Sequence, residues 1–204
     1  MKETRGQLLL VCRANVCRSV YAHALLSAHL PQQVALASAG VKAAVGAEPC
    51  PLVRERCDRL GIELPAPVGR PCTPDLLADA DLVLVMTREL QDAVARLQLS
   101  ARSKTFTIPA CVASLEATVS QGTNVGSVAE LADVLNNLRG SVANPRVRPR
   151  LGLLGRASQP ATGIPDGHIH SKREHKQTLT MLERQCESLA AAWQKAWHPA
   201  EVHH

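Results

Sequence analysis

The segment from Leu8 to Leu30 constrains the fold more than any other part of the chain. It opens with the apolar run Leu8–Val11, which predicts a buried strand of a parallel sheet. The apolar run from Ser19 to Leu30 predicts a helix with Ser19 at its N-cap. Only the short loop from Cys12 to Arg18 joins the two, so strand and helix are consecutive elements of an α/β unit.

The rest of the chain continues this alternation of apolar runs and amphipathic segments. Strands that alternate with helices form a parallel sheet covered by helices on both faces. We therefore predict a three-layer α/β/α fold around a central four-stranded parallel sheet. The further predicted strands are 34–38, 81–86 and 104–108, and the predicted helices are 51–60, 87–97, 110–117, 125–138 and 171–197.

A single domain over residues 1–204 is the simplest organisation, because a chain of 204 residues can bury one sizeable core. Residues 140–163 are rich in Pro, Gly and Arg and predict an irregular loop. We expect the extra length, around residues 112–162, to be an irregular insertion in this domain.

Charge and apolar patterning limit the partners and the location of the protein. The net charge of +5 favours anionic partners, but no aromatic residues lie among the clustered arginines, so nucleic acid is not expected. No apolar run is long enough for a signal peptide or a membrane span. The seven scattered cysteines are typical of a reducing compartment, so we expect a soluble cytoplasmic protein without a membrane partner.

The loop from Cys12 to Arg18 is a candidate phosphate site. Parallel sheets bind ligands at the carboxyl ends of their strands, and the N–H groups of a tight loop and a helix N-terminus attract an anion. Small Ala14 and turn-tolerant Asn15 suit such a concave loop. A thiolate at Cys12 would attack phosphorus and form a phosphocysteine, which water hydrolyses. Arg18 would hold two phosphoryl oxygens, and Ser19 would donate its hydroxyl to the sulfur.

The same spacing recurs from Cys50 to Arg56, which shows that spacing alone is weak support for a site. This second copy follows no predicted strand, and Pro51 begins a predicted helix inside it. A helical interior cannot form a concave loop. We therefore do not assign Cys50 to a phosphate site.

Motifs along the chain resemble the low-molecular-weight protein tyrosine phosphatase family, in particular its longer bacterial members. That family opens with a strand and then Cys-x-x-Asn-x-Cys-Arg-Ser, the pattern of Cys12–Ser19 here. Its Ser-Ala-Gly turn is matched by 38–40, and its Asp-Leu-Val-Leu-Val-Met-like strand by 81–86. Ile164-Pro165-Asp166 stands where the family has Ile-x-Asp before its last helix.

The resemblance implies a cofactor-free hydrolase that acts on phosphorylated protein, above all phosphotyrosine, or on another phosphomonoester. It implies that Cys12 is the nucleophile, Arg18 the phosphate ligand and Asp166 the general acid. A reversible Cys12–Cys17 disulfide that protects the nucleophile is also implied. The implied cradle and its supports are Arg13, Ala14, Asn15, Val16, Cys17, Ser19 and Ser38.

The residues expected around the substrate depart from the family pattern. Arg13 replaces an apolar residue, and Gly167 and His168 replace the proline and the aromatic that follow the acid. That aromatic forms one wall of the slot for a phenyl ring. The residues available to replace it are Tyr21, Phe106, Trp193 and Trp197. A more polar or more open slot is expected, and Arg13 would favour a second acidic group on the substrate.

Two alternatives stay open at this point. Arsenate reductases share this fold and loop, and Cys50 and Cys57 have a spacing suited to one helix. The changes at Gly167 and His168 suggest instead an oxyanion-binding or regulatory module with little turnover.

We expect no metal site. The three histidines at 168, 170 and 175 lie near one predicted helix start, but the sequence places no acidic or cysteine partner beside them.

Overall fold

The computed structural model describes residues 4–66, 69–141 and 163–198. A four-stranded sheet in the order β2-β1-β3-β4 lies at its centre, and every pair of neighbours is parallel. This confirms the predicted sheet. The strands are β1 (Gln7–Cys12), β2 (Ala35–Gly40), β3 (Leu82–Val85) and β4 (Thr105–Thr107).

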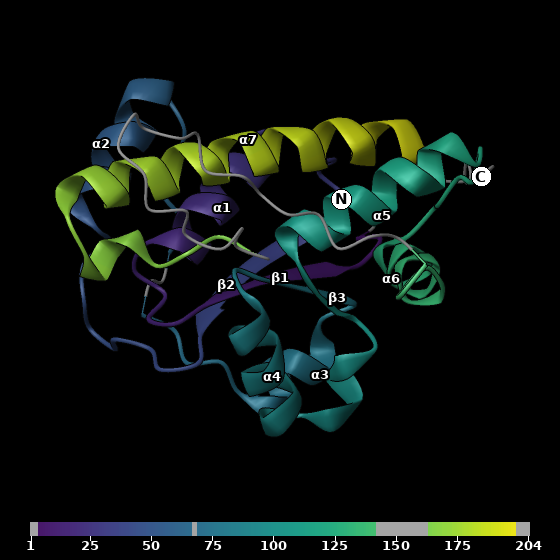
Figure 1. Ribbon diagram of the computed structural model, residues 1–204, viewed down its shortest axis with the longest axis horizontal. Helices are drawn as coiled ribbons and strands as arrows, with labels where there is room; N and C mark the ends of the chain where they lie inside the picture. Colours follow the sequence, from purple (N-terminus) through teal and green to yellow (C-terminus); the bar gives the residue numbers. More distant parts are fainter. Residues whose placement is uncertain (1–3, 67–68, 142–162, 199–204) are drawn as a thin grey trace, which may run out of the picture.

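Helices cover both faces of the sheet and complete the three layers (Figure 1). α1, α5 and α7 lie on one face, where α7 packs against both α1 and α5, whereas α3 and α4 lie on the other face. The helices are α1 (Arg18–Ser27), α2 (Pro51–Leu60), α3 (Pro74–Asp79), α4 (Arg88–Leu97), α5 (Ile108–Ser120), α6 (Val128–Asn137) and α7 (Lys172–Ala196), with 3₁₀ turns η1 (Leu99–Arg102) and η2 (Gly167–Ile169).

The core is built from aliphatic side chains of the sheet and of α7. The run Leu8–Val11 is completely buried, as a strand covered on both faces requires. On α7 an apolar face of Leu179, Leu182, Cys186 and Leu189 is likewise buried. Helices on both faces bury β1. Its carboxyl end, where Cys12 lies, is therefore fixed at the end of the sheet that all four parallel strands share.

Several element boundaries differ from the predicted ones for local reasons. α1 begins at Arg18 with Cys17 at its N-cap, and Ser19 is not a cap because its hydroxyl is bonded to the Cys12 sulfur. The strand predicted over 104–108 ends at Thr107, whose hydroxyl caps α5. α3 was not predicted because it is only six residues long, although Thr73 caps it.

Helices occupy the first part of the 112–162 segment, since α5 ends at Ser120 and α6 ends at Asn137. Residues 142–162, which include most of the predicted irregular loop, lie outside the described residues. In the ranges that are described, no helix has the length and apolar character needed to cross a bilayer.

Candidate active site

Residues 12–19, the Cys12 loop, turn the carbonyls of four successive peptides outward. Each of these carbonyls accepts a hydrogen bond from backbone outside the loop. Because C=O and N–H point in opposite directions in a trans peptide, the N–H groups of residues 14–17 turn inward. The bonds are Lys42 N to Arg13 O (2.8 Å), Ala44 N to Ala14 O (3.0 Å), Gly69 N to Asn15 O (2.9 Å) and Cys50 N to Val16 O (2.8 Å).

The Cys12 sulfur lies at the centre of this ring of donors. The backbone N–H of Asn15 donates to Sγ at 3.2 Å, and the Ser19 hydroxyl donates to it at 3.0 Å. The side chain is only 3% exposed. Two hydrogen-bond donors thus point at the atom that is predicted to attack phosphorus.

Asn15 holds the shape of the Cys12 loop. It is the non-glycine residue with a positive φ (55°) in the described ranges, a conformation that Asn tolerates better than most residues. Its buried amide donates to Ser19 Oγ (3.0 Å) and Ser38 Oγ (2.9 Å), and it accepts from the Arg70 backbone N–H (2.8 Å). The predicted supports Asn15, Ser19 and Ser38 thus form one hydrogen-bond network.

Gly40 lets β2 approach the Cys12 loop closely. It lies opposite Cys12 in the sheet register. A Cβ atom on Gly40 would lie 2.8 Å from the Arg13 carbonyl oxygen and 2.8 Å from the Ala14 carbonyl carbon. No larger residue fits behind the loop without moving its backbone.

Arg18 and Asp166 form a partly buried ion pair although they are 148 residues apart. Arg18 is 3% exposed, and its Nη1 also donates to the Ile164 carbonyl at 3.2 Å. The structure therefore brings the predicted phosphate ligand and the predicted general acid together, close to the Cys12 loop.

Residues 163–170, the Asp166 segment, rest on β3 and α7. The Ile164 N–H donates to the Met86 carbonyl at 2.6 Å, just beyond the end of β3. A Cβ on Gly167 would lie 2.6 Å from the Glu174 carbonyl oxygen of α7, so only glycine fits there. These two contacts set the position of Asp166 between them.

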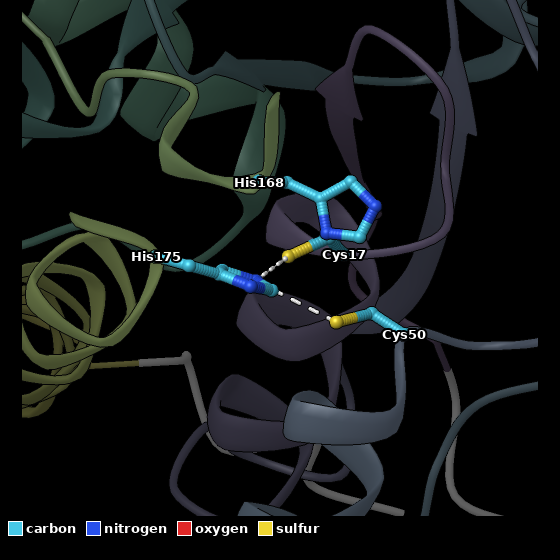
Figure 2. A group of neighbouring side chains, drawn as sticks. All are labelled: Cys17, Cys50, His168 and His175. Atoms are coloured by element: carbon cyan, nitrogen blue, oxygen red, sulfur yellow. Dashed lines mark hydrogen bonds between the residues drawn. The ribbon is translucent and has the colours of Figure 1, made fainter. Parts of the chain in front are cut away.

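A second group of side chains lies directly behind the Cys12 loop (Figure 2). His175 Nε2 is 3.1 Å from Cys17 Sγ and 3.5 Å from Cys50 Sγ, and the ring of His168 meets that of His175 edge to face. The expectation that these histidines have no cysteine partner was wrong, because Cys17 and Cys50 reach them from other elements. The hydrogen bond between the Cys17 and Cys50 thiols lowers the pKa of Cys50 to about 5 and raises the pKa of Cys17.

None of the four Phe, Tyr and Trp residues, all of which the structure describes, replaces the missing aromatic wall. Tyr21, Phe106 and Trp193 are buried in the core. Trp197 packs against Trp193 at the end of α7, with 5.9 Å between ring centroids. Exposed residues near the predicted nucleophile and acid in the chain include Arg13, Pro165 and His168.

Sequence reasoning missed the backbone that supports the Cys12 loop from outside, such as Arg70. These residues act through N–H groups that any residue except proline carries, so their identities give no signal. The cysteines are all free thiols, and the Cys12–Cys17 disulfide stays a prediction.

Comparisons with known proteins match this chain to low molecular weight protein tyrosine phosphatases. A family model described as low molecular weight phosphotyrosine protein phosphatase matches residues 7–144. The probable low molecular weight protein-tyrosine-phosphatase AmsI of Erwinia amylovora is 39% identical over 101 residues, 50% of this chain and 69% of that protein. The phosphatase Ptp of Acinetobacter johnsonii is 32% identical over 99 residues, 48% of this chain and 69% of its own length.

Solved structures share the fold over nearly the whole chain. The crystal structure of the Erwinia amylovora tyrosine phosphatase AmsI matches with a TM-score of 0.61 at 24% identity, covering 92% of each chain. The YwlE arginine phosphatase of Geobacillus stearothermophilus matches with a TM-score of 0.61 at 25% identity, covering 93% of each chain.

Proposed function

Because this chain belongs to the low molecular weight phosphotyrosine protein phosphatase family, we propose that it hydrolyses protein phosphotyrosine through a phosphocysteine on Cys12. The Arg18–Asp166 pair next to the Cys12 loop is the observation that carries this proposal. It unites a nucleophile, a phosphate ligand and a proton donor from distant parts of the sequence.

Phosphate binding uses the inward N–H groups of residues 14–17 together with Arg18. Three non-bridging oxygens of a phosphoryl group need donors on several sides, and the ring of N–H groups supplies them. The planar guanidinium of Arg18 adds two donors whose spacing suits two equatorial oxygens of the five-coordinate transition state. The same groups stabilise charge that develops during transfer.

In the first step the Cys12 thiolate attacks phosphorus in line with the ester bond. The S–P bond forms as the P–O bond to the leaving group breaks, and Asp166 gives its proton to the departing oxygen. Substrate first has to replace Asp166 as the partner of Arg18. The carboxyl, once released from Arg18, brings to the departing oxygen the proton that this step requires.

In the second step water attacks the phosphocysteine. Asp166, now a carboxylate, takes the proton of the water, and the S–P bond breaks to release inorganic phosphate and the Cys12 thiolate. The Ser19 hydroxyl at 3.0 Å stabilises the sulfur as it regains its charge.

The rim of the site favours a polar or acidic environment around the phosphorylated residue. With no aromatic wall, a phenyl ring gains less stacking than it would between two aromatic faces. The exposed guanidinium of Arg13 attracts a carboxylate next to the phosphorylated side chain. Acidic phosphotyrosine peptides are therefore the proposed substrates.

The test is hydrolysis of p-nitrophenyl phosphate by the wild type and by Cys12→Ser. We expect the variant to lose more than about 10⁴-fold in kcat while it still binds vanadate, because the N–H groups and Arg18 remain. Cys72→Ser, another buried thiol, is the matched control and keeps wild-type turnover. Substantial turnover by Cys12→Ser would overturn the proposal.

Substrate class is tested with matched phosphotyrosine, phosphoserine and phosphoarginine peptides, each with and without flanking glutamates. The proposal predicts the highest kcat/KM for the acidic phosphotyrosine peptide, and Arg13→Ala removes the benefit of the glutamates. Arsenate-dependent thiol oxidation without p-nitrophenyl phosphate turnover would support a reductase instead. Tight phosphate binding without either activity would support a binding module.

A further inference from the structure

We propose that Cys17, Cys50, His168 and His175 form a zinc site behind the Cys12 loop. Each side chain offers one ligand atom, and the four atoms lie within 4.8 Å of one another. Two thiolates and two imidazoles are a donor set that Zn²⁺ binds in tetrahedral geometry. The proposal does not depend on the phosphatase activity.

The distances fit a tetrahedral ion after small movements. Zn–S bonds of about 2.3 Å and Zn–N bonds of about 2.0–2.1 Å place ligand atoms about 3.3–3.8 Å apart. His175 Nε2 already lies 3.1 Å from Cys17 Sγ and 3.5 Å from Cys50 Sγ. Figure 2 shows the four side chains gathered together, with dashed lines from His175 to both sulfurs.

The four ligands come from four separate elements that the fold has already brought together. Cys17 precedes α1, Cys50 precedes α2, His168 lies in η2 and His175 lies near the start of α7. Little chain entropy is therefore lost on binding, because the ligands are already positioned.

Charge and access also favour a divalent cation. When both thiols release their protons to solvent, the two thiolates neutralise Zn²⁺, so the buried site carries no net charge. A cleft of about 360 Å³ is lined by Cys50, His168 and His175 and opens to solvent. An ion can reach the site along this cleft without passing Cys12.

A zinc ion here would link the Asp166 segment to the Cys12 loop. His168 is two residues from Asp166, and Cys17 is the residue before Arg18. The ion would thereby hold the two halves of the active site against each other.

The test measures Zn²⁺ binding to the full chain, reduced under anaerobic conditions, by elemental analysis and by competition with a chromogenic chelator. We expect one Zn²⁺ per chain. Cys50→Ser and His168→Ala each remove a ligand and should weaken binding by more than about 100-fold, beyond the effect of losing an outer-shell partner. Cobalt in the same site should give the visible bands of a four-coordinate, thiolate-bound ion.

Three controls locate the metal. Cys57→Ser changes a buried thiol farther along α2, and His170→Ala changes a neighbouring histidine in the same cleft; both should bind Zn²⁺ as the wild type does. Cys12→Ser should also retain the metal. Circular dichroism of each variant verifies that it is folded.

Zinc at about 100 times its Kd should raise the Tm of the wild type by about 5–10 °C and leave that of Cys50→Ser nearly unchanged. The proposal fails if the folded wild type binds no Zn²⁺, or if Cys50→Ser and His168→Ala bind it as tightly as their controls. Loss of the metal from Cys12→Ser alone would place it in the active site and would equally overturn the proposal.

Discussion

The Cys12 loop and the Asp166 segment meet in the same site but are held in opposite ways. Backbone from three other stretches hydrogen-bonds the loop carbonyls, and the Asn15 side chain fastens the loop from inside. The Asp166 segment has one backbone bond to β3, contacts with Arg18 and packing on α7. In the proposed mechanism, phosphate binding thus rests on a preorganised backbone, whereas acid catalysis rests on a side chain that exchanges partners.

The Arg18–Asp166 ion pair links the Cys12 loop to the Asp166 segment. Arg18 belongs to the loop and is shielded from water, so its pairing with Asp166 is stronger than a surface pair. Phosphate has two negative charges and two oxygens for the guanidinium fork, so it can replace the carboxylate. The loop keeps its geometry during this exchange, and Asp166 changes partner.

Among the substitutions that compare the two regions, Arg18→Lys is expected to have the largest effect, because it alters both regions at once. Lysine keeps the charge but loses the planar fork, so kcat/KM for p-nitrophenyl phosphate should fall by about 10³-fold. Arg56→Lys is the matched control, since Arg56 pairs with Glu183 on α7 (2.5 Å) away from Cys12. If Arg18→Lys and Arg56→Lys lowered kcat/KM equally, the proposed role of Arg18 would be contradicted.

Asp166→Asn removes the proposed proton donor and leaves the phosphate-binding groups of the Cys12 loop in place. For phenyl phosphate, whose leaving group needs a proton, kcat/KM should fall by about 10²-fold, whereas kcat/KM for p-nitrophenyl phosphate should be affected much less. Vanadate affinity should stay the same or rise, because Arg18 no longer pairs with a carboxylate. A loss of equal size for both esters would contradict the acid role.

The two regions also differ in how far sequence alone could predict them. The Cys12 loop is local: a buried strand, a short loop and a helix follow one another, so the positions of Cys12 and Arg18 followed from a single segment. Asp166 looks like an ordinary turn residue without the family resemblance, because its partner lies far away in the sequence. Only the folded chain shows that the end of β3 and the start of α7 bring it to Arg18.

The cluster behind the loop shows the same limit more strongly. Cys17, Cys50 and His175 come from three elements with no shared motif. In the sequence, Cys50 stood out only as a false copy of the loop spacing and as a possible redox partner of Cys57. Their contact depends on how α1, α2 and α7 pack, and helix packing leaves no periodic signal of that kind. The parallel sheet and α7 could be predicted because each has its own apolar pattern.

Asn15→Ala tests the rigidity of the loop. The substitution removes three hydrogen bonds, two of them buried, and places a less tolerant residue at φ 55°. We therefore expect about 3 kcal/mol lower unfolding free energy and roughly tenfold lower kcat. Urea unfolding gives the first quantity. Asn137→Ala, on the exposed end of α6, should change stability by less than about 0.5 kcal/mol. A similarly small effect at Asn15 would mean that the loop is not held by this side chain.

Gly167→Ala is expected to have the smallest effect and acts on the acid alone. The added methyl would press on the Glu174 carbonyl and on Thr178 Oγ1, so the Asp166 segment has to shift. We expect kcat for phenyl phosphate to fall about threefold to tenfold, because the acid is slightly misplaced. Vanadate affinity should be unchanged. Weaker vanadate binding would show that the two regions are not independent.

The most direct test of the account is to trap the phosphocysteine. Asp166→Asn is mixed with p-nitrophenyl phosphate and quenched with acid within the first turnover, because the variant also slows the attack of water. Peptide mass spectrometry should then find one added phosphoryl group, on the peptide that contains Cys12 and on its sulfur. A phosphoryl group on any other residue, or turnover with no phosphoenzyme at any time point, would contradict the central claim that Cys12 is the nucleophile.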